Sequence, residues 1–116
     1  MSDELRIGVV MSFEKGGAKA QRSETIQVDV TGDAFGHEIQ TIPTSNTALV
    51  EPAAVGTPGY YFIKNLDATN FVTIGLTSSY AVKLLAGEIA LFRAAGAIYA
   101  LADTASVNLE YWVIEA

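Results

Sequence analysis

The sequence predicts an all-β protein, an antiparallel β-sandwich that is jelly-roll-like and has about eight or nine short strands. Turn-forming clusters of Gly, Pro, Asn, Asp, Ser and Thr recur along the 116 residues, and many runs between them are about five to nine residues long. Because 50% of the residues are hydrophobic and only 17% are charged, the chain can form a core. We expect one sandwich domain over residues 1–116, with residues 1–5 as a flexible N-terminal arm.

The first expected strands lie in the N-terminal third of the chain. The run 5–13 has an apolar side chain at every second position from Ile7 to Phe13, so these side chains share one face of a strand. The run 25–30 alternates strictly between apolar and polar residues. The segment Glu14–Ser23 between them is polar and contains two glycines, and we interpret it as a mobile loop.

The strands expected after residue 59 are separated by polar turns. Tyr60–Asn65 is aromatic and β-branched, and Asn70–Leu76 places apolar side chains at alternate positions. Asp67 lies between them and can accept hydrogen bonds from turn N–H groups, so we expect the two runs to form a hairpin. A second turn is expected at Leu84–Glu88. The prediction is a meander over residues 60–114, with the N-terminal strands completing the second sheet.

One segment, Ala86–Ala102, is also compatible with a helix because it is rich in Ala and Leu. Gly87 and Gly96 oppose a helix, since each glycine costs about 1 kcal/mol in a helix interior. The alternation of side chains also permits strands. We therefore predict two short strands here, Ile89–Arg93 and Ile98–Leu101.

The acidic composition excludes several kinds of partner. Thirteen acidic residues against seven basic ones give a net charge of −6, so we expect no binding to nucleic acid and none to an anionic membrane surface. The absence of cysteine excludes disulfides and thiolate metal sites. No apolar run approaches the roughly 18 residues of a membrane span, and the N-terminus lacks the basic region of a secretory signal. We expect a soluble product made in the cytoplasm.

Residues with catalytic or ligand-binding potential are few. His37 is the only histidine, and we interpret it as an exposed structural residue. Asp29–Asp33 resembles part of a calcium loop, but a polar turn explains it better because the bidentate Glu of a full loop is missing. Gly16–Lys19 lacks the spacing of a phosphate-binding loop, and the eight glutamates are scattered. We expect no catalytic residue, no cofactor and no metal, and therefore no enzyme.

Three consecutive aromatic residues, Tyr60, Tyr61 and Phe62, stand in one expected strand. Successive side chains of a strand point to opposite faces, so the three cannot all enter one core. We interpret them, with Trp112 in the last strand, as a subunit interface; a core with a groove and stacking on a ligand are the alternatives. The charge distribution favours a partner, because residues 41–116 hold only nine of the twenty charges. Thr, Ser and Asn can equally supply the missing polarity.

The chain has one basic cluster, formed by Lys15, Lys19 and Arg22. Such a cluster can contact an acidic protein surface, or it can simply be a solvated loop.

The second half resembles the small structural proteins of tailed bacteriophage virions, especially capsid decoration (cement) proteins and related tail or fibre modules. The resemblance covers residues 59–115 and depends on Lys-Asn-Leu-Asp-x-Thr-Asn at Lys64–Asn70 and Leu-x-Ala-Gly-Glu at Leu84–Glu88. It implies a non-enzymatic homotrimer that binds the major capsid protein on the outer surface of an assembled capsid and stabilises it. The alternative is a tail or fibre module that binds a host carbohydrate or receptor.

If the chain is a decoration protein, we expect the aromatic cluster to be the oligomer interface and the basic cluster to contact the capsid. The expected arm, residues 1–5, and the expected loop, residues 14–23, are the segments that order on binding.

Overall fold

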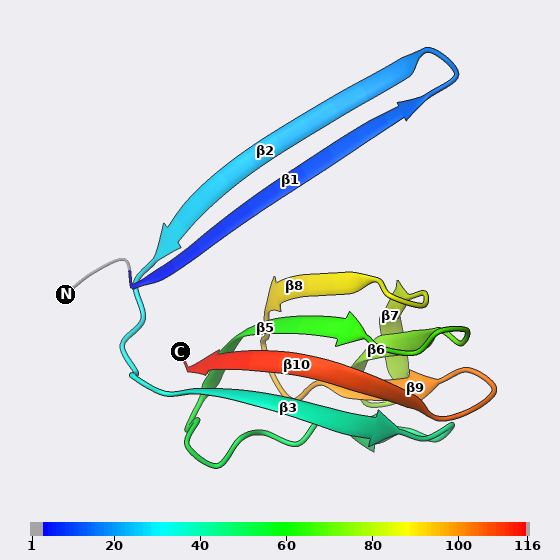
Figure 1. The fold of residues 1–116 in the computed structure, drawn as a ribbon. Coiled ribbons are helices and arrows are strands. Elements are labelled where there is room, and N and C mark those ends of the chain that lie inside the picture. The colour runs from blue at the N-terminus through cyan, green and yellow to red at the C-terminus, as the bar shows by residue number, and fades with distance from the viewer. Residues whose placement is uncertain (1–3, 116) are drawn as a thin grey trace. The chain divides into compact units, whose positions relative to one another are not determined.

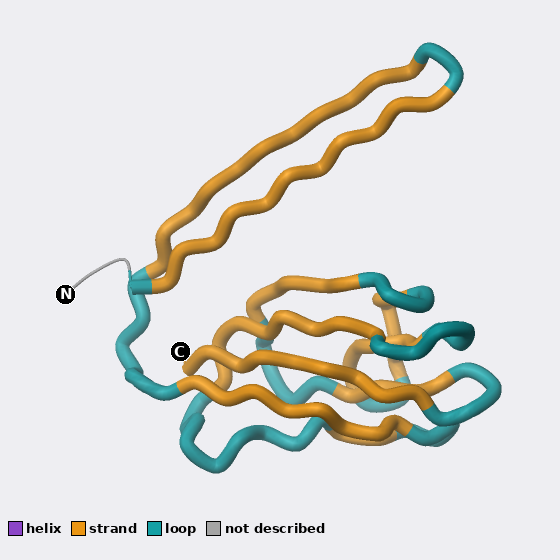
Figure 2. The backbone as a smooth tube through the Cα atoms, viewed as in Figure 1, coloured by secondary structure: helices purple, strands orange, loops and turns teal. Residues whose placement is uncertain are grey.

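The computed structural model describes residues 4–115, which form ten strands and no helix (Figures 1 and 2). The chain divides into two compact units, Met1–Thr31 and Gly32–Ala116, and each is described by itself below. The all-β prediction is confirmed. The sandwich lies within the second unit, and the first unit is a separate hairpin.

The first unit is a long antiparallel hairpin of β1 (Leu5–Lys15) and β2 (Ala18–Val28). The two strands pair without a register shift from their open end to the turn. The turn consists only of Gly16 and Gly17, whose φ angles of 57° and 89° suit a type I′ turn. The expected mobile loop over Glu14–Ser23 is therefore wrong, because two consecutive glycines reverse the chain at once and the flanking residues join the ladder. Of the expected arm, residues 1–3 lie outside the described residues.

The second unit contains two four-stranded antiparallel sheets, with strand orders β3-β10-β5-β8 and β4-β9-β6-β7. Their bounds are β3 (Phe35–Ile42), β4 (Thr47–Ala48), β5 (Pro58–Asn65), β6 (Val72–Leu76), β7 (Ser79–Leu84), β8 (Ile89–Arg93), β9 (Tyr99–Ala102) and β10 (Val107–Glu115).

The pairing of these strands is that of a jelly roll. β3 pairs with β10, β4 with β9, β5 with β8 and β6 with β7, so the strands form one long antiparallel ribbon that reverses between β6 and β7. Rolling this ribbon places alternate pairs in alternate sheets. The expected meander is wrong, because β5 and β6 lie in different sheets. Their connection crosses from one sheet to the other and does not close a hairpin.

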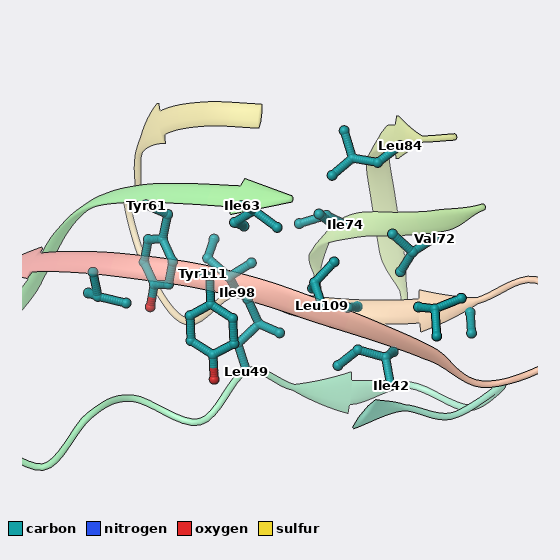
Figure 3. Packing of buried hydrophobic residues seen from close by; sticks show 14 of the residues in the cluster. Ile42, Leu49, Tyr61, Ile63, Val72, Ile74, Leu84, Ile98, Leu109 and Tyr111 are labelled. Carbon is teal, nitrogen blue, oxygen red and sulfur yellow. The ribbon is translucent and has the colours of Figure 1, made fainter. Parts of the chain in front are cut away.

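The core lies between the two sheets, whose inner side chains point toward one another (Figure 3). The first sheet contributes Ile63 and Leu109, and the second contributes Val72 and Ile74; all four are at most 1% exposed. The full cluster of buried apolar residues is Ile42, Leu49, Val55, Tyr61, Ile63, Val72, Ile74, Leu84, Ile98, Ala100, Ala102, Val107, Leu109, Tyr111 and Val113.

The turn after β5 is fixed by a buried asparagine. The Asn65 side-chain amide donates to the carbonyls of Asn70 and Leu84 at 3.0 and 3.1 Å, and its oxygen accepts from Asp67 N–H at 2.9 Å. The Asp67 carboxylate accepts from the backbone N–H groups of Thr69 and Asn70, as expected. These two N–H groups, Asn70 first, lower the pKa of Asp67.

The ambiguous segment contains two strands, as predicted. β8 has the predicted bounds, and β9 is shifted by one residue from Ile98–Leu101. Gly87 has a φ of 81° in the turn before β8, a conformation that favours glycine. Within the described residues there is no helix that is long and apolar enough to cross a membrane.

Candidate functional site

Apolar and aromatic side chains predominate on the side of the β3-β10-β5-β8 sheet that faces away from the core. Register and strand alternation form three rows there that cross all four strands, and we call these three rows the outer sheet face. Its residues are Phe35, His37, Ile39, Tyr60, Phe62, Lys64, Ile89, Leu91, Arg93, Glu110, Trp112 and Ile114.

The central row of this face crosses all four strands. His37 of β3 is opposite Trp112 of β10, Trp112 is opposite Phe62 of β5, and Phe62 is opposite Leu91 of β8. Cross-strand neighbours on one face have Cβ atoms about 5 Å apart, so these side chains form a continuous band. The next row, which contains Tyr60, extends the band toward the start of β5.

Ring contacts order one end of the band. The Trp112 ring stacks on His37 with centroids 4.6 Å apart, and on Phe35 at 5.8 Å. The other His37 contact is polar, since its Nε2 lies 2.6 Å from a carboxylate oxygen of Glu110. Arg93 lies over the Tyr60 ring at 4.7 Å. Arg93, His37 and Glu110 thus contact an aromatic ring or each other, and Lys64 lies in an outer row of the face.

Of the four residues predicted as an oligomer interface, Tyr60, Phe62 and Trp112 lie together on the outer sheet face. Tyr61 does not: it points into the core, is 1% exposed and stacks on Phe92 (Figure 3). Its burial, with a smaller effect of Glu51, raises its pKa to about 12. Tyr61 offers no surface to a partner, because residues 60, 61 and 62 alternate between the two sides of β5.

Other members of the outer sheet face were not identified from the sequence. Phe35 and Ile39 of β3 are each 59% exposed, and Ile89 of β8 is 56% exposed. The signal that could have found them is a period-two run of large apolar residues on the side opposite the core positions. Isolated exposed apolar residues are common, but a continuous band of them marks a binding surface.

The hairpin has a second apolar surface. Odd positions of β1 and even positions of β2 share one side, which we call the hairpin apolar face. Met11 on this face is 65% exposed and Phe13 is 54% exposed. Its residues are Leu5, Ile7, Val9, Met11, Phe13, Lys15, Ala18, Ala20, Arg22, Glu24, Ile26 and Val28.

The predicted basic cluster does not form one patch. Lys15 and Arg22 belong to the hairpin apolar face, and Lys19 belongs to the opposite, polar face. Arg22 forms an ion pair with Glu24 at 2.5 Å, and Lys19 lies 3.5 Å from Glu14. These residues belong to a continuous ladder and not to a loop, so neighbouring side chains point to opposite sides.

Among residues 4–115, no group of three His, Cys, Asp or Glu side chains is placed to hold a metal ion. A hollow of about 250 Å³ near β7 and β8 is lined mainly by apolar side chains, among them Ile74, Val82 and Phe92.

Comparisons with protein-family models, curated proteins and solved structures found no match to this chain.

Proposed function

We propose that this chain is a non-enzymatic structural protein of a tailed-phage virion, a homo-oligomeric decoration protein that binds an assembled capsid and stabilises it. The observation that carries the proposal is the outer sheet face, an aromatic and aliphatic band exposed across a whole sheet. The trimeric state and the phage setting come from the resemblance of residues 59–115.

The composition of the outer sheet face fits a protein interface. Interface centres are enriched in aromatic residues and depleted of Lys and Glu. The central row of His37, Trp112, Phe62 and Leu91 has that composition. Lys64 and Glu110 lie in an outer row, where a polar rim is expected. A second copy that covers the band removes its apolar surface from water, which stabilises the complex.

The size of the band explains why an assembled shell is the preferred partner. Four strands spaced about 4.8 Å apart and about five residues long give a face of only roughly 300–400 Å². Stable interfaces bury about 800 Å² on each partner, so single contacts of this size are weak. An oligomer that engages several identical sites gains effective concentration, and such sites have a fixed spacing only on an assembled lattice.

The hairpin tip provides the proposed capsid contact. Lys15 and Lys19 flank the glycine turn, one on each face, and each is exposed. Arg22, the third residue of the predicted basic cluster, is farther from the turn. We therefore retain Lys15 and Lys19 as the capsid-contact residues.

The test compares stripped capsids with free capsid subunits, using wild type, Phe62→Asp and Asn108→Asp. Asn108 lies on the same sheet side as Phe62 but outside the apolar rows, and its partner Thr41 can also donate to an aspartate, so it is the matched control. We expect wild type and Asn108→Asp to bind capsids much more tightly than subunits, and Phe62→Asp to lose association through the outer sheet face and, with it, capsid binding. Equal affinity of wild type for capsids and subunits would contradict the proposal.

A second function, binding of a host-surface carbohydrate or receptor, is favoured by one feature. Trp112 is 40% exposed, and its stacking on Phe35 and His37 fixes its ring orientation; an exposed, fixed aromatic ring is a common feature of sugar-binding sites. Because Trp112 is the only tryptophan, its fluorescence reports directly on ligand binding. Saturable quenching by a host glycan, abolished in Trp112→Ala, together with no capsid binding would establish this function instead.

A further inference from the structure

The hairpin apolar face has a self-complementary pattern. We propose that it packs against the same face of a second copy, with the two hairpins antiparallel about a two-fold axis that is perpendicular to the strands. β2 of one copy then lies over β2 of the second copy. The inference rests on the proposed homo-oligomer and adds a second contact, distinct from the outer sheet face.

The hairpin needs a covering layer. A two-stranded hairpin without further packing is marginally stable in water. None of the residues of β1 or β2 is buried, and Val9, Met11, Phe13 and Ile26 are among the exposed large apolar side chains. The opposite face carries Ser12, Gln21, Ser23 and Thr25 among others, with Val10 as its one large apolar side chain, so the side that contains Met11 and Phe13 is the one that requires cover.

The sizes of the side chains match in the antiparallel arrangement. The face has six levels, from Leu5 and Val28 at the open end to Lys15 and Ala18 at the turn. Antiparallel packing places the first level over the sixth of the second copy and the second over the fifth. Val28 then meets Ala18, Ile26 meets Ala20 and Ile7 meets Phe13. Large side chains meet small ones along β2, as close packing between sheets requires.

The charges match as well. The third level contains Glu24 and the fourth contains Arg22, and antiparallel packing superposes these two levels. Each Glu24 therefore lies over Arg22 of the second copy, and the two ion pairs of the separate hairpins become one cluster of four charges. Parallel packing about the other two-fold axis instead places Glu24 over Val9 and Arg22 over Met11. That arrangement places both central charges against apolar groups, which is unfavourable. In the antiparallel arrangement Lys15 alone lies over an apolar side chain, Leu5, and it does so at the end of the contact, where its ammonium group reaches water. The charges therefore select the antiparallel arrangement.

The area that two hairpins bury against each other sets how tightly they bind. Strands of eleven residues at about 3.4 Å per residue give a ribbon about 37 Å long. With a width of about 10 Å, each hairpin buries roughly 370 Å², about half of what a stable complex uses on each partner. The contact is therefore weak between single chains and is strengthened where the outer sheet face already holds several chains together. The hairpins link such oligomers in pairs.

A charge-swap experiment on the full chain tests this proposal. Arg22→Glu gives a hairpin with two acidic residues at the centre, and Glu24→Arg gives one with two basic residues. We expect each variant alone to lose hairpin-mediated association by about tenfold or more, because like charges oppose one another in both levels. An equimolar mixture is expected to recover the wild-type sedimentation profile, although neither variant keeps its own ion pair. Single variants that associate like wild type, or a mixture that does not recover, would overturn the proposal.

A spin label determines the orientation. The chain has no cysteine, so Lys15→Cys provides a unique attachment site beside the turn. Spin-labelled chains are mixed with ¹⁵N-labelled wild type, and amide broadening is measured on the latter. The antiparallel arrangement predicts broadening at Leu5 and Val28, whereas broadening around Gly16 and Gly17, or none in the hairpin, would overturn it. Repeating both measurements with Phe62→Asp separates this contact from the outer sheet face, because the proposed hairpin contact persists in that variant while the proposed function requires Phe62.

Discussion

The hairpin and the sandwich have the same local chemistry but reach different degrees of burial. Both consist of antiparallel strands in which apolar and polar side chains alternate. In the sandwich, two sheets cover each other and residues such as Leu109 are completely buried. In the hairpin, the same alternation produces an apolar side and no residue of either strand is buried. Alternation therefore specifies which side of a strand is apolar, and only a second layer turns that side into a core.

The two regions also differ in charge. Residues 5–28 carry four basic and two acidic side chains, a net charge of +2. Residues 32–116 carry three basic and eight acidic ones, a net charge of −5. The two strands of the hairpin are thus basic, although the whole first unit, residues 1–31, carries five acidic and four basic side chains. Basic side chains on the hairpin suit a contact with an acidic protein surface.

The largest expected effect comes from placing the same charge on the two sides of β5. Tyr61→Asp places a charge in the core, and we expect it to unfold the sandwich, a loss of more than about 4 kcal/mol. Phe62→Asp places the same charge one residue later on the outer sheet face, and we expect a folded protein that no longer associates through this face. Circular dichroism and sedimentation velocity distinguish the two results. A folded Tyr61→Asp variant would contradict the assigned register of β5.

A pair of truncations compares the core with the hairpin. Leu109→Ala removes a fully buried side chain, and we expect the sandwich to lose about 2–5 kcal/mol of unfolding free energy. Phe13→Ala removes a larger side chain from the hairpin, and we expect the unfolding midpoint of the sandwich to stay unchanged. Urea titration followed by Trp112 fluorescence measures both, since the only tryptophan is in the sandwich. Equal destabilisation by the two changes would show that the units are not separate.

The hairpin turn provides a smaller effect with an internal control. Gly17 has a φ of 89°, where a side chain is strained by about 1–2 kcal/mol, so Gly17→Ala should reduce the population of the hairpin. In Gly8→Ala the new Cβ would lie 3.8 Å from the Thr25 hydroxyl, an ordinary contact, and we expect no loss. Amide hydrogen exchange of β1 and β2 reports both. Loss of protection in Gly8→Ala alone would exclude the assigned turn.

The smallest expected effect is a dependence on pH. The Glu115 carboxylate accepts from the N–H groups of Gly56, Asp33 and Ala34, and these bonds, Gly56 first, lower its pKa. Because the folded sandwich holds this carboxylate in its charged form, the lowered pKa stabilises the sandwich at pH values above the ordinary carboxyl pKa. This stabilisation is lost as the pH falls and the carboxylate takes up a proton. We therefore expect the urea midpoint of the sandwich to drop between about pH 5 and pH 3, and less steeply in Glu115→Gln. Glu14→Gln in the hairpin should leave the profile of the sandwich unchanged; a change there would oppose this assignment.

The local parts of the fold could be predicted from the sequence, because they depend on neighbouring residues. β8 follows from alternation in Ile89–Arg93, and the turn before it follows from Gly87. For the jelly roll, the sequence predicts the fold class but not which strands pair with each other. β3 pairs with β10, about seventy residues later, and no local pattern encodes that choice. The turn after β5 resembles a hairpin turn, although the strands it joins lie in different sheets.

The candidate surfaces could be predicted in part. The aromatic run identified the right strand but not which of its residues face the core; the side follows from the pairing of Tyr61 with Val113. The hairpin could have been found, because Gly16–Gly17 between two alternating runs is a strong signal for a two-residue turn. The residues beyond that turn resemble a loop in the sequence, because small and charged residues interrupt the apolar side of β2. These interruptions are the features that make the hairpin apolar face self-complementary.

The central claim is that copies of this chain cover one another's apolar surfaces, and sedimentation equilibrium of the full chain tests it most directly. At micromolar concentration we expect species whose masses are multiples of 12.3 kDa, with a trimer preferred. Phe62→Asp is expected to shift the distribution toward smaller species, and Asn108→Asp to leave it unchanged. A wild-type protein that sediments only as a 12.3 kDa monomer, indistinguishable from Phe62→Asp, would contradict the claim.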